Sequence, residues 1–367
     1  MTVRRARSSL NSPSNLPHYD MILDSGAYSA WKLKKPIDVK EYTRYAKANA
    51  DMYSTIVNLD VIGPNDPETA AAASFENLKY MMAQGLDVMP VYHARENKDW
   101  LHRMLDLGCR KIGLSASSLV QRNQVDDWYS MAWGELVDSK GLPLVKAHAF
   151  GESRFASLAP FPWYSADSAS WIIQAEVSGK TVVKMENGRS TTFGVRHDKL
   201  HTKSSPDIDS LDENEVVAFN EFIQDTGMTM DFFREPGPIG AMARLWALAR
   251  IYIETETRVR KLCPIRHTGH GLFNRPKAYA AIAKWPTIHI PDFKFHLVCN
   301  INPRTWLPII KTGHRRLLVS YFYTEQMKSF DFRNFVYNHV DEVIKSKSSG
   351  RYWKEFHEFA ASKGITI

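Results

Sequence analysis

Cysteine is scarce in this 367-residue chain, which has only Cys109, Cys263 and Cys299. Three widely spaced cysteines cannot form the even, closely spaced framework of a small secreted disulfide protein. We therefore expect a protein of a reducing compartment, located in the cytoplasm. Because 44% of the residues are hydrophobic, the chain can bury a large core, in either one large domain or two ordinary ones.

Long apolar runs are also missing. No stretch reaches the roughly 18 uncharged apolar residues of a membrane span, so we expect no membrane partner. The nearest candidate, residues 239–253, is interrupted by Arg244 and Arg250 and predicts an amphipathic helix. Residues 1–17 are basic but lack the apolar region of a signal peptide, which indicates a flexible basic arm.

Several common active-site motifs are absent as well. The segment EVSGKT resembles the end of a phosphate-binding loop, but Gln174 stands where that loop needs a glycine. No G-x-G-x-x-G follows a predicted strand, and GLSAS, around Ser115, lacks the pattern of a nucleophile elbow. These absences argue against nucleotide-triphosphate enzymes, dinucleotide-dependent enzymes and serine hydrolases, and we expect no cofactor.

The C-terminal half contains a set of residues that could bind zinc: Cys263, His267, His270, His296 and Cys299. Four thiolate and imidazole ligands are enough for such a site. Their spacing matches no standard zinc motif, however, and scattered histidines and buried cysteines are commoner than metal sites. We therefore predict no bound metal.

The chain does contain a repeated alternation of short apolar runs with helical stretches. In residues 66–85, Asp66 can cap a helix, Pro67 suits its first turn and Gly85 suits its exit. Strands that alternate with helices at this spacing predict βαβ units and a parallel sheet. The predicted strands of the first half cover 21–25, 54–61, 86–93, 110–117, 143–151 and 162–170.

Polar residues lie at or near the C-terminal ends of these runs: Asp24, Asp60, His93, Ser115, His148 and Asp167. A TIM-type (β/α)8 barrel gathers all such ends at one mouth, whereas an open sheet concentrates function at a single switch point. We therefore predict an α/β fold with a TIM-type barrel, in which residues 18–171 supply the first six βα units and the active site.

The alternation breaks after residue 171. Residues 172–290 predict an inserted α+β region, with a strand pair that turns near Asn187 and Gly188 and with helices at 213–226 and 238–260. Strands return at 293–300 and 315–323, and we expect residues 291–367 to close the barrel.

Five segments, in the order LDSGAYS, VNLDV, IGLSAS, HAFG and YSADSASW, resemble the guanine transglycosylases, a family that includes the queuine and archaeosine tRNA enzymes. The family consists of TIM barrels that replace guanine in nucleic acid with a 7-deazaguanine such as preQ0. The likeness is greatest to phage-type members that modify DNA. It covers residues 20–171 well and is weak over 172–290. Because FKFHLVCN and RRLLVSYFYT resemble segments that precede the D-S-G element in those members, the resemblance implies a circular permutation.

The resemblance implies roles for two catalytic carboxylates. Asp167 matches the nucleophile, which attacks C1′ and carries the covalent nucleotide after guanine leaves. Asp24 matches the general acid and base, which protonates the leaving base and deprotonates the incoming one. Base exchange without hydrolysis independently requires such a pair, as retaining glycosidases do.

The resemblance also implies a set of substrate-binding residues, which consists of Ser25, Tyr28, Asp60, His93, Gly113, Leu114, His148, Phe150 and Gly151. Tyr28 and Phe150 would cover the two faces of the base, and Asp60 would accept hydrogen bonds from its Watson–Crick edge. Gly113 and Leu114 match a loop whose backbone reads the substituent of the deazapurine.

Ordinary structural roles are open for each of these residues. A strand-end aspartate such as Asp24 or Asp60 often serves only as a helix N-cap or a hydrogen-bond acceptor. Tyr28, Trp31 and Trp171 could be core aromatics, and the histidines could be structural. Three carboxylates at three strand ends nevertheless favour function, because burying several acids around one cavity is costly.

The charge of the chain indicates a polyanionic partner. Its net charge is +7, and we expect the basic arm and the C-terminal lysines to contact phosphates.

The resemblance also favours DNA over tRNA as the partner. The tRNA enzymes carry a C-x-C-x-x-C zinc cluster with a later histidine, and no such cluster follows Asp167. The favoured DNA would be single-stranded or would present a flipped guanine. A phage origin would place the protein in the host cytoplasm. Three alternatives remain: exchange in tRNA, a catalytically silent nucleic-acid-binding homologue, and a glycoside hydrolase.

Overall fold

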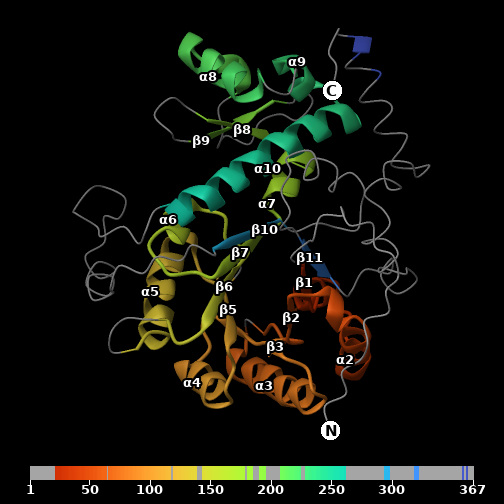
Figure 1. Ribbon diagram of the computed structural model, residues 1–367, viewed down its shortest axis with the longest axis vertical. Coiled ribbons are helices and arrows are strands. Elements are labelled where there is room, and N and C mark those ends of the chain that lie inside the picture. The colour runs from red at the N-terminus through yellow and green to blue at the C-terminus, as the bar shows by residue number, and fades with distance from the viewer. Residues whose placement is uncertain are drawn as a thin grey trace.

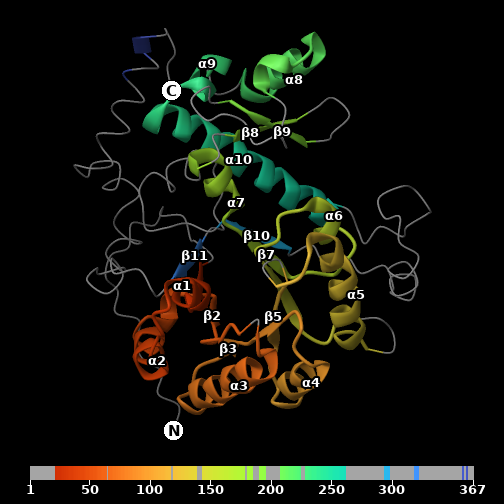
Figure 2. The ribbon, with the colours of Figure 1, turned by 180° about the vertical axis from the view of Figure 1, so that it is seen from behind.

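The computed structural model describes residues 21–63, 65–116, 119–138, 143–177, 180–184, 190–195, 207–224, 228–261, 293–297, 318–321, 358 and 361–362. The predicted basic arm, the turn near Asn187 and Gly188, and most of 291–367 lie outside these residues. Figures 1 and 2 show the strands in the centre, helices α2 to α5 around them, and the inserted elements gathered at one end.

Every predicted strand of the first half is present, with shorter bounds. The strands are β1 (Met21–Asp24), β2 (Thr55–Val57), β3 (Val88–Met89), β4 (Val91–His93), β5 (Lys111–Ser115), β6 (Lys146–Phe150) and β7 (Ser165–Ser168). The helices that follow them are α1 (Ala27–Leu33), α2 (Val39–Ala48), α3 (Pro67–Ala83), α4 (Lys98–Asp106), α5 (Val125–Glu135), α6 (Phe155–Leu158) and α7 (Ser170–Ile172). The strand predicted at 86–93 is divided at Pro90, because proline has no N–H to donate to a ladder.

These strands pair in parallel, which confirms the predicted mixed α/β class. One sheet has the order β11-β1-β2-β3 and the other β10-β7-β6-β5-β4. β10 (Lys294–Leu297) and β11 (Leu318–Tyr321) are the two predicted C-terminal strands. β3 and β4 are consecutive in the chain and so join the two sheets, and Cα atoms of β10 and β11 come within 8 Å of one another.

The two faces of the strands are buried in different hydrophobic clusters. Leu23 of β1 belongs to the large core that the strands share with the surrounding helices. A separate small cluster consists of Ile22, Val57, Met89 and Val91, with Phe150 and Ala169 packed against it. Because side chains alternate along a strand, Asp24 lies on the face of Ile22 and away from that of Leu23.

Helix α3 forms as its sequence predicts. Asp66 is its N-cap, with Oδ1 accepting a hydrogen bond from the N–H of Thr69 at 3.1 Å, and Pro67 is its first residue. Gly85 follows the last turn with a φ of 83°, a conformation that glycine adopts without strain. These bounds confirm that local capping residues set both ends of the helix.

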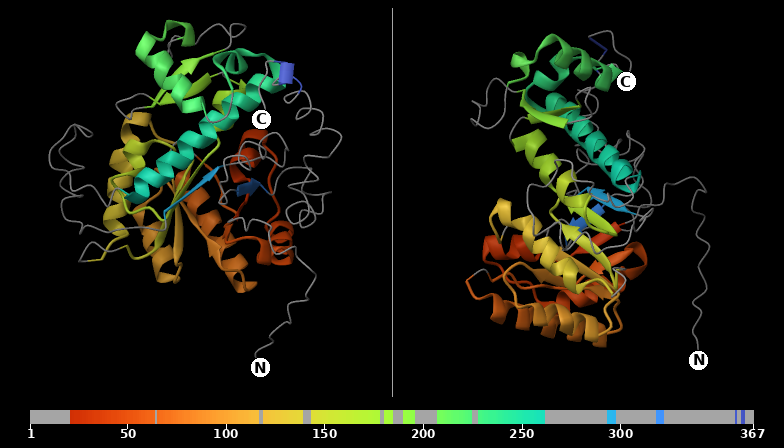
Figure 3. Two further views of the ribbon diagram at one scale, coloured as in Figure 1. Left: turned by 45° about the horizontal axis from the view of Figure 1, so that its top comes forward. Right: turned by 90° about the vertical axis from the view of Figure 1, so that its left-hand side faces the viewer.

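The inserted region has the predicted α+β character. β8 (Lys180–Lys184) and β9 (Ser190–Gly194) pair antiparallel, and α8 (Glu213–Ile223) and α10 (Gly237–Lys261) correspond to the two predicted helices. A π-helical segment (Ile173–Val177) and α9 (Met230–Arg234) were not predicted. Figure 3 shows α10 running from the inserted elements back towards α6 and β10, both of which it contacts.

The amphipathic pattern predicted for residues 239–253 is wrong at Arg244, whose side chain is fully buried. Its Nε donates to the carbonyl oxygen of Ala175 at 2.9 Å and its Nη1 donates to that of Phe233 at 2.6 Å. Carbonyl acceptors therefore replace water around the guanidinium and offset the cost of burying its charge. In the part of the chain that the structure describes, no helix is both long and apolar enough to cross a membrane.

Candidate active site

Asp24 ends β1, and the chain turns immediately after it. Gly26 has a φ of 78°, in the left-handed region that favours glycine, and is the N-cap of α1. Burial and the negative charges of Asp60 and Asp167 hold the pKa of Asp24 well above its usual value, although the backbone N–H groups of Ser25 and Gly26 donate to its carboxylate and oppose that shift. Asp24, Asp60 and Asp167, predicted at three strand ends, thus belong to one electrostatically coupled site.

Asp167 lies on β7 and is held through one oxygen. Its Oδ1 accepts a hydrogen bond from the N–H of Gly151 at 2.8 Å and lies 3.3 Å from Nε2 of His148, whose Nδ1 lies 2.8 Å from Oγ of Ser165. Gly151 has a φ of 65°, which explains why glycine follows Phe150 here. Among the residues that the structure describes, none donates a hydrogen bond to Oδ2 of Asp167, so one oxygen of this buried carboxylate is left for a ligand.

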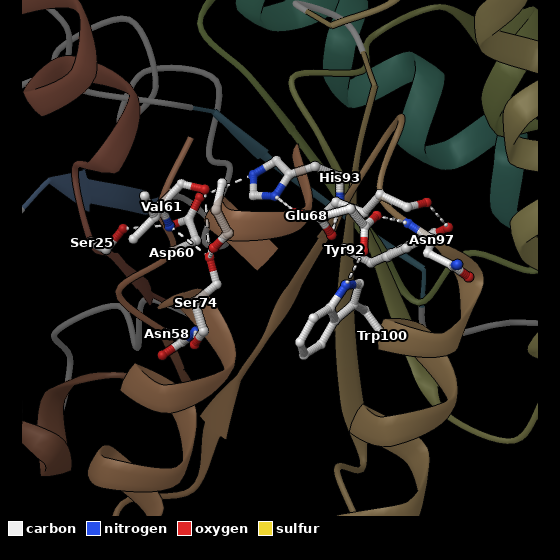
Figure 4. A network of polar contacts seen from close by, with 12 residues as sticks. Ser25, Asn58, Asp60, Val61, Glu68, Ser74, Tyr92, His93, Asn97 and Trp100 are labelled. Atoms are coloured by element: carbon white, nitrogen blue, oxygen red, sulfur yellow. Dashed lines mark hydrogen bonds and ion pairs between the residues drawn. The ribbon is translucent and has the colours of Figure 1, made fainter. Parts of the chain in front are cut away.

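Asp60 belongs to a buried charged network, which Figure 4 shows in close-up. Oγ of Ser25 donates to its Oδ1 at 3.0 Å, and Nε2 of His93 lies 3.0 Å from its Oδ2. Nδ1 of His93 lies 3.1 Å from Oε1 of Glu96, whose Oε2 also accepts the backbone N–H of His93. Since both ring nitrogens have a carboxylate partner, the geometry favours a role for His93 in positioning Asp60 over direct contact with a ligand.

The pKa of His93 is raised to about 10. Burial alone would lower it, but the hydrogen bonds to Asp60 and Glu96 and the charges of these carboxylates outweigh burial. His93 is therefore an imidazolium ion at neutral pH, and it compensates two buried negative charges.

This charge state predicts how stability depends on pH. A group whose pKa is raised on folding stabilises the protein fully below its unfolded pKa of about 6.5 and loses that contribution as the pH rises through about 10. Because each pKa unit corresponds to about 1.4 kcal/mol, the wild type should lose more than about 1 kcal/mol of this contribution by about pH 9. The free energy of unfolding, measured by urea denaturation from pH 6 to pH 10, tests this expectation.

A matched pair of variants isolates His93 in that measurement. His93→Gln should be less stable than the wild type at pH 6 and should lose less stability on going to pH 10. His102→Gln is the control, because His102 lies on the surface beside Glu135. If His93→Gln followed the same pH profile as the wild type, the imidazolium assignment would be wrong.

Gly113 and Leu114 lie inside β5, as the strand predicted at 110–117 requires, and not in the loop that the family resemblance implies. The N–H of Gly113 donates to the carbonyl oxygen of Pro90 at 2.8 Å, and the side chain of Leu114 is fully buried in the large core. The strand needs glycine at residue 113 because an added methyl group would overlap the ring of Phe150. Phe150 in turn packs edge-on against His148, with ring centroids 4.5 Å apart.

Gly113→Ala should therefore displace Phe150 and destabilise the protein. Overpacking a tight site usually costs about 1–3 kcal/mol, and denaturant unfolding would measure that loss. Gly134→Ala on α5 is the matched control, since nothing lies within 4 Å of a methyl group there. Equal stability of the two variants would show that Phe150 does not depend on the absence of a side chain at residue 113.

The aromatic residues considered for the site differ in their surroundings. Trp171 is fully buried, which confirms the alternative that it is a core residue. Tyr28 on α1 is 47% exposed, so it does not belong to the core. It remains a candidate for stacking on a ligand, as predicted.

Two residues of the site were not predicted to be there. Glu96 binds His93, and the spacing of three residues after a strand-end histidine is the only sequence signal for it. His296 on β10 is in register with Asp167, and its ring centroid lies 6.2 Å from that of His148. The alternation of side chains in the strand KFHL is the sequence signal that could have placed His296 on the face of the sheet where Asp167 lies.

Four of the five residues of the zinc alternative lie outside the described residues. His296 lies in the strand beside Asp167, while Cys263, His267, His270 and Cys299 lie outside the described ranges. The described part of the chain contains no group of three or more histidines, cysteines and acids placed to hold a metal ion.

The chain matches no protein-family model, no curated protein and no solved structure. The function must therefore follow from the site itself. Its central elements are an aspartate with a raised pKa, a second aspartate fastened through one oxygen, and a third held by an imidazolium ion.

Proposed function

We propose that this protein is a base-exchange transglycosylase, which replaces guanine in DNA with a preQ0-like 7-deazaguanine through a covalent aspartyl-nucleotide intermediate. One observation carries the proposal: Asp60 and Asp167 both lie close enough to Asp24 to raise its pKa. A carboxyl group whose pKa is raised, lying near a second carboxylate, is what acid-assisted displacement at a sugar carbon requires.

The proposed reaction assigns a step to each of the two catalytic carboxylates. Asp167 attacks C1′ with Oδ2 while the glycosidic bond to N9 of guanine breaks, and the proton of Asp24 passes to the leaving base. Asp24 then removes the N9 proton of the incoming 7-deazaguanine. That nitrogen attacks C1′, the ester to Asp167 breaks, and both carboxylates return to their starting states.

The remaining polar residues would hold the base and the nucleophile. Asp60, kept in place by Ser25 and His93, is positioned to accept hydrogen bonds from the Watson–Crick edge of guanine. Gly151 and His148 would orient Asp167. The roles of these residues in positioning Asp60 and Asp167 belong to the same proposal.

The proposal includes a closed TIM-type barrel with eight parallel strands. Three observations support closure of the barrel. The strands follow one another around the two sheets in the chain order β1 to β7, β10 and β11, and β3 and β4 lie in one segment that joins the sheets. In addition, β10 approaches β11. The small cluster around Ile22 and Val57 would fill the interior of the barrel. A sequential strand order is also what a circularly permuted barrel would have, so this order is compatible with the permutation.

The test is base exchange in a defined polymer. Purified protein would be incubated with preQ0 and, separately, single-stranded DNA, duplex DNA or tRNA, and the nucleosides would then be analysed by mass spectrometry. Deazaguanine in DNA is the expected result. Its appearance only in tRNA would keep the chemistry and overturn the substrate, and its absence from all three polymers would overturn the proposed activity.

A further inference from the structure

The side chains of α1 and the turn after it form an exposed surface next to the candidate active site. We infer that this surface binds single-stranded nucleic acid through base stacking and phosphate contacts. It is called here the α1 patch and consists of Tyr28, Trp31, Lys32, Leu33, Lys34 and Lys35. The inference rests on the proposed function for its biological partner, but the binding can be measured without base exchange.

The position of the α1 patch follows from the course of the chain. α1 begins three residues after Asp24, which ends β1, and Figure 2 shows the helix beside β11 and β2. A helix rises about 1.5 Å per residue, so all of α1 lies within about 10 Å of its start. Nucleotides that neighbour one held at Asp24 would therefore pass over α1.

The aromatic side chains of the patch present ring surface to solvent. Tyr28 is 47% exposed, Trp31 is half-buried, and their ring centroids lie 5.8 Å apart at an angle of 56°. Leu33 beside them is 59% exposed. Large apolar side chains exposed on a helix beside a candidate site are candidates for recognition, and aromatic rings accept any base because every base has a flat face.

Positive charge surrounds these rings. Between residues 32 and 47 the chain has six cations, Lys32, Lys34, Lys35, Lys40, Arg44 and Lys47, against the two anions Asp38 and Glu41, which gives +4 where the whole chain has +7. All six cations are exposed. Within the described residues, Lys32, Lys34 and Lys35 form no ion pair, so their charges are available to phosphates.

Two of these lysines, Lys32 and Lys34, belong to the same short segment as the aromatic rings. Nζ of Lys32 lies 4.4 Å from the ring centroid of Trp31 and 5.5 Å from that of Tyr28. Such a cation–π contact is worth only about 0.5–1 kcal/mol at an exposed site, so a stacking base can replace it and leave the ammonium for its phosphate. Lys34 has a φ of 54° at the C-cap of α1, where glycine is usual, so a charged residue stands at this position despite the backbone strain.

These features favour a single strand over a duplex. Paired bases hide their faces in the stack, so a duplex would use the lysines but not Tyr28 and Trp31. The combination of tilted aromatic rings with unpaired lysines therefore fits unstacked nucleotides. Preference for duplex DNA becomes the competing outcome of the test.

Fluorescence anisotropy with a labelled mixed-sequence deoxyoligonucleotide, single-stranded or annealed to its complement, tests the inference. Trp31→Ala should weaken single-strand binding by about 5- to 150-fold, the range expected for losing one stacked base. The combined variant Lys32→Ala/Lys34→Ala/Lys35→Ala should reduce the slope of log affinity against log salt by about 2, since each phosphate contact contributes about 0.7 for single strands.

Three further variants control the measurement. Lys79→Ala removes an exposed lysine that lies 5.7 Å from the ring of Phe75 on α3, and it should bind like the wild type. Trp31→Phe should restore most of the affinity that Trp31→Ala loses. Because the three lysines are exposed, their combined variant tests the patch even if Trp31→Ala fails to fold.

The outcomes separate this inference from the proposed activity. Unchanged single-strand affinity in the lysine variant, or binding confined to the duplex, would overturn the α1 patch whether or not bases are exchanged. Loss of affinity in the lysine variant, together with absence of exchange by the wild type, would keep the α1 patch and overturn the proposed activity. Loss of affinity in the lysine variant, together with exchange by the wild type, supports both the α1 patch and the proposed activity.

Discussion

Asp167→Asn is expected to abolish base exchange while leaving the affinity for DNA nearly unchanged. The amide matches the carboxylate in size and can still accept the hydrogen bond from the N–H of Gly151, which is 2.8 Å from Oδ1 in the wild type. It cannot attack C1′ as an anion, however. Loss of one member of a catalytic unit typically lowers the rate by about 10⁴-fold or more, and we expect a loss of that size.

Two measurements on the same samples would test the role of Asp167. Incorporation of preQ0 into DNA gives the rate, and a denaturing gel reveals the covalent adduct that the wild type should form when no incoming base is present. Glu135→Gln is the control, because Glu135 pairs on the surface with Lys98 and His102. Exchange or an adduct at wild-type levels in Asp167→Asn would rule out this residue as nucleophile.

Asp24→Asn is expected to lose exchange and to gain stability. The variant cannot transfer a proton to the leaving base, and general acid–base catalysis usually contributes about 10²- to 10⁴-fold. At the same time it removes a carboxylate that burial, Asp60 and Asp167 all disfavour in its charged form. A rise of a few degrees in Tm is expected, since about 1 kcal/mol corresponds to roughly 2–4 °C in proteins of 150–250 residues and to less in larger ones.

The stability gain of Asp24→Asn should depend on pH in the direction that the raised pKa of Asp24 predicts. An acid whose pKa is raised on folding contributes stability below its unfolded pKa of about 3.9 and loses that contribution as the pH rises through the folded value. The difference in Tm between Asp24→Asn and the wild type should therefore be smallest near about pH 4 and largest above neutrality.

Asp66→Asn is a suitable control for these melting curves, since asparagine also serves as an N-cap and α3 should remain capped. A Tm of Asp24→Asn below that of the wild type at neutral pH would contradict the electrostatic origin of the raised pKa. Full exchange activity in Asp24→Asn would contradict its role as acid and base.

The fold could be predicted from the sequence where local patterns determine it. Short apolar runs that end in polar residues identified the strands of both sheets, and the capping residues Asp66 and Gly85 identified the ends of α3. Pro90 and Arg244 show the limit of such patterns. Pro90 divides a predicted strand because it has no N–H to donate, whereas the burial of Arg244 depends on acceptors that two distant residues, Ala175 and Phe233, supply.

The candidate site was predictable to a similar degree. The aspartates Asp24, Asp60 and Asp167 could be placed together because parallel strands bring their C-terminal ends to one edge. The state of His93 could not be foreseen, since its pKa depends on two carboxylates whose distances only the folded chain sets. Gly113 was predicted within the strand at 110–117, but its close approach to Phe150 could not be foreseen, because it depends on how β5 and β6 pack in the folded chain.

The pairing of β1 with β11 has a consequence for the order in which this protein is made. Met21 lies opposite Leu318, and Asp24 lies opposite Tyr321. At a synthesis rate of about 5–20 residues per second, roughly 15–60 s separate the emergence of these partners from the ribosome. During that interval the nascent chain has β1 without this neighbour, and its open edge can pair with other chains. The newly made protein therefore depends on β11 to complete the sheet around Asp24, and chaperones that shield strand edges would act in this window.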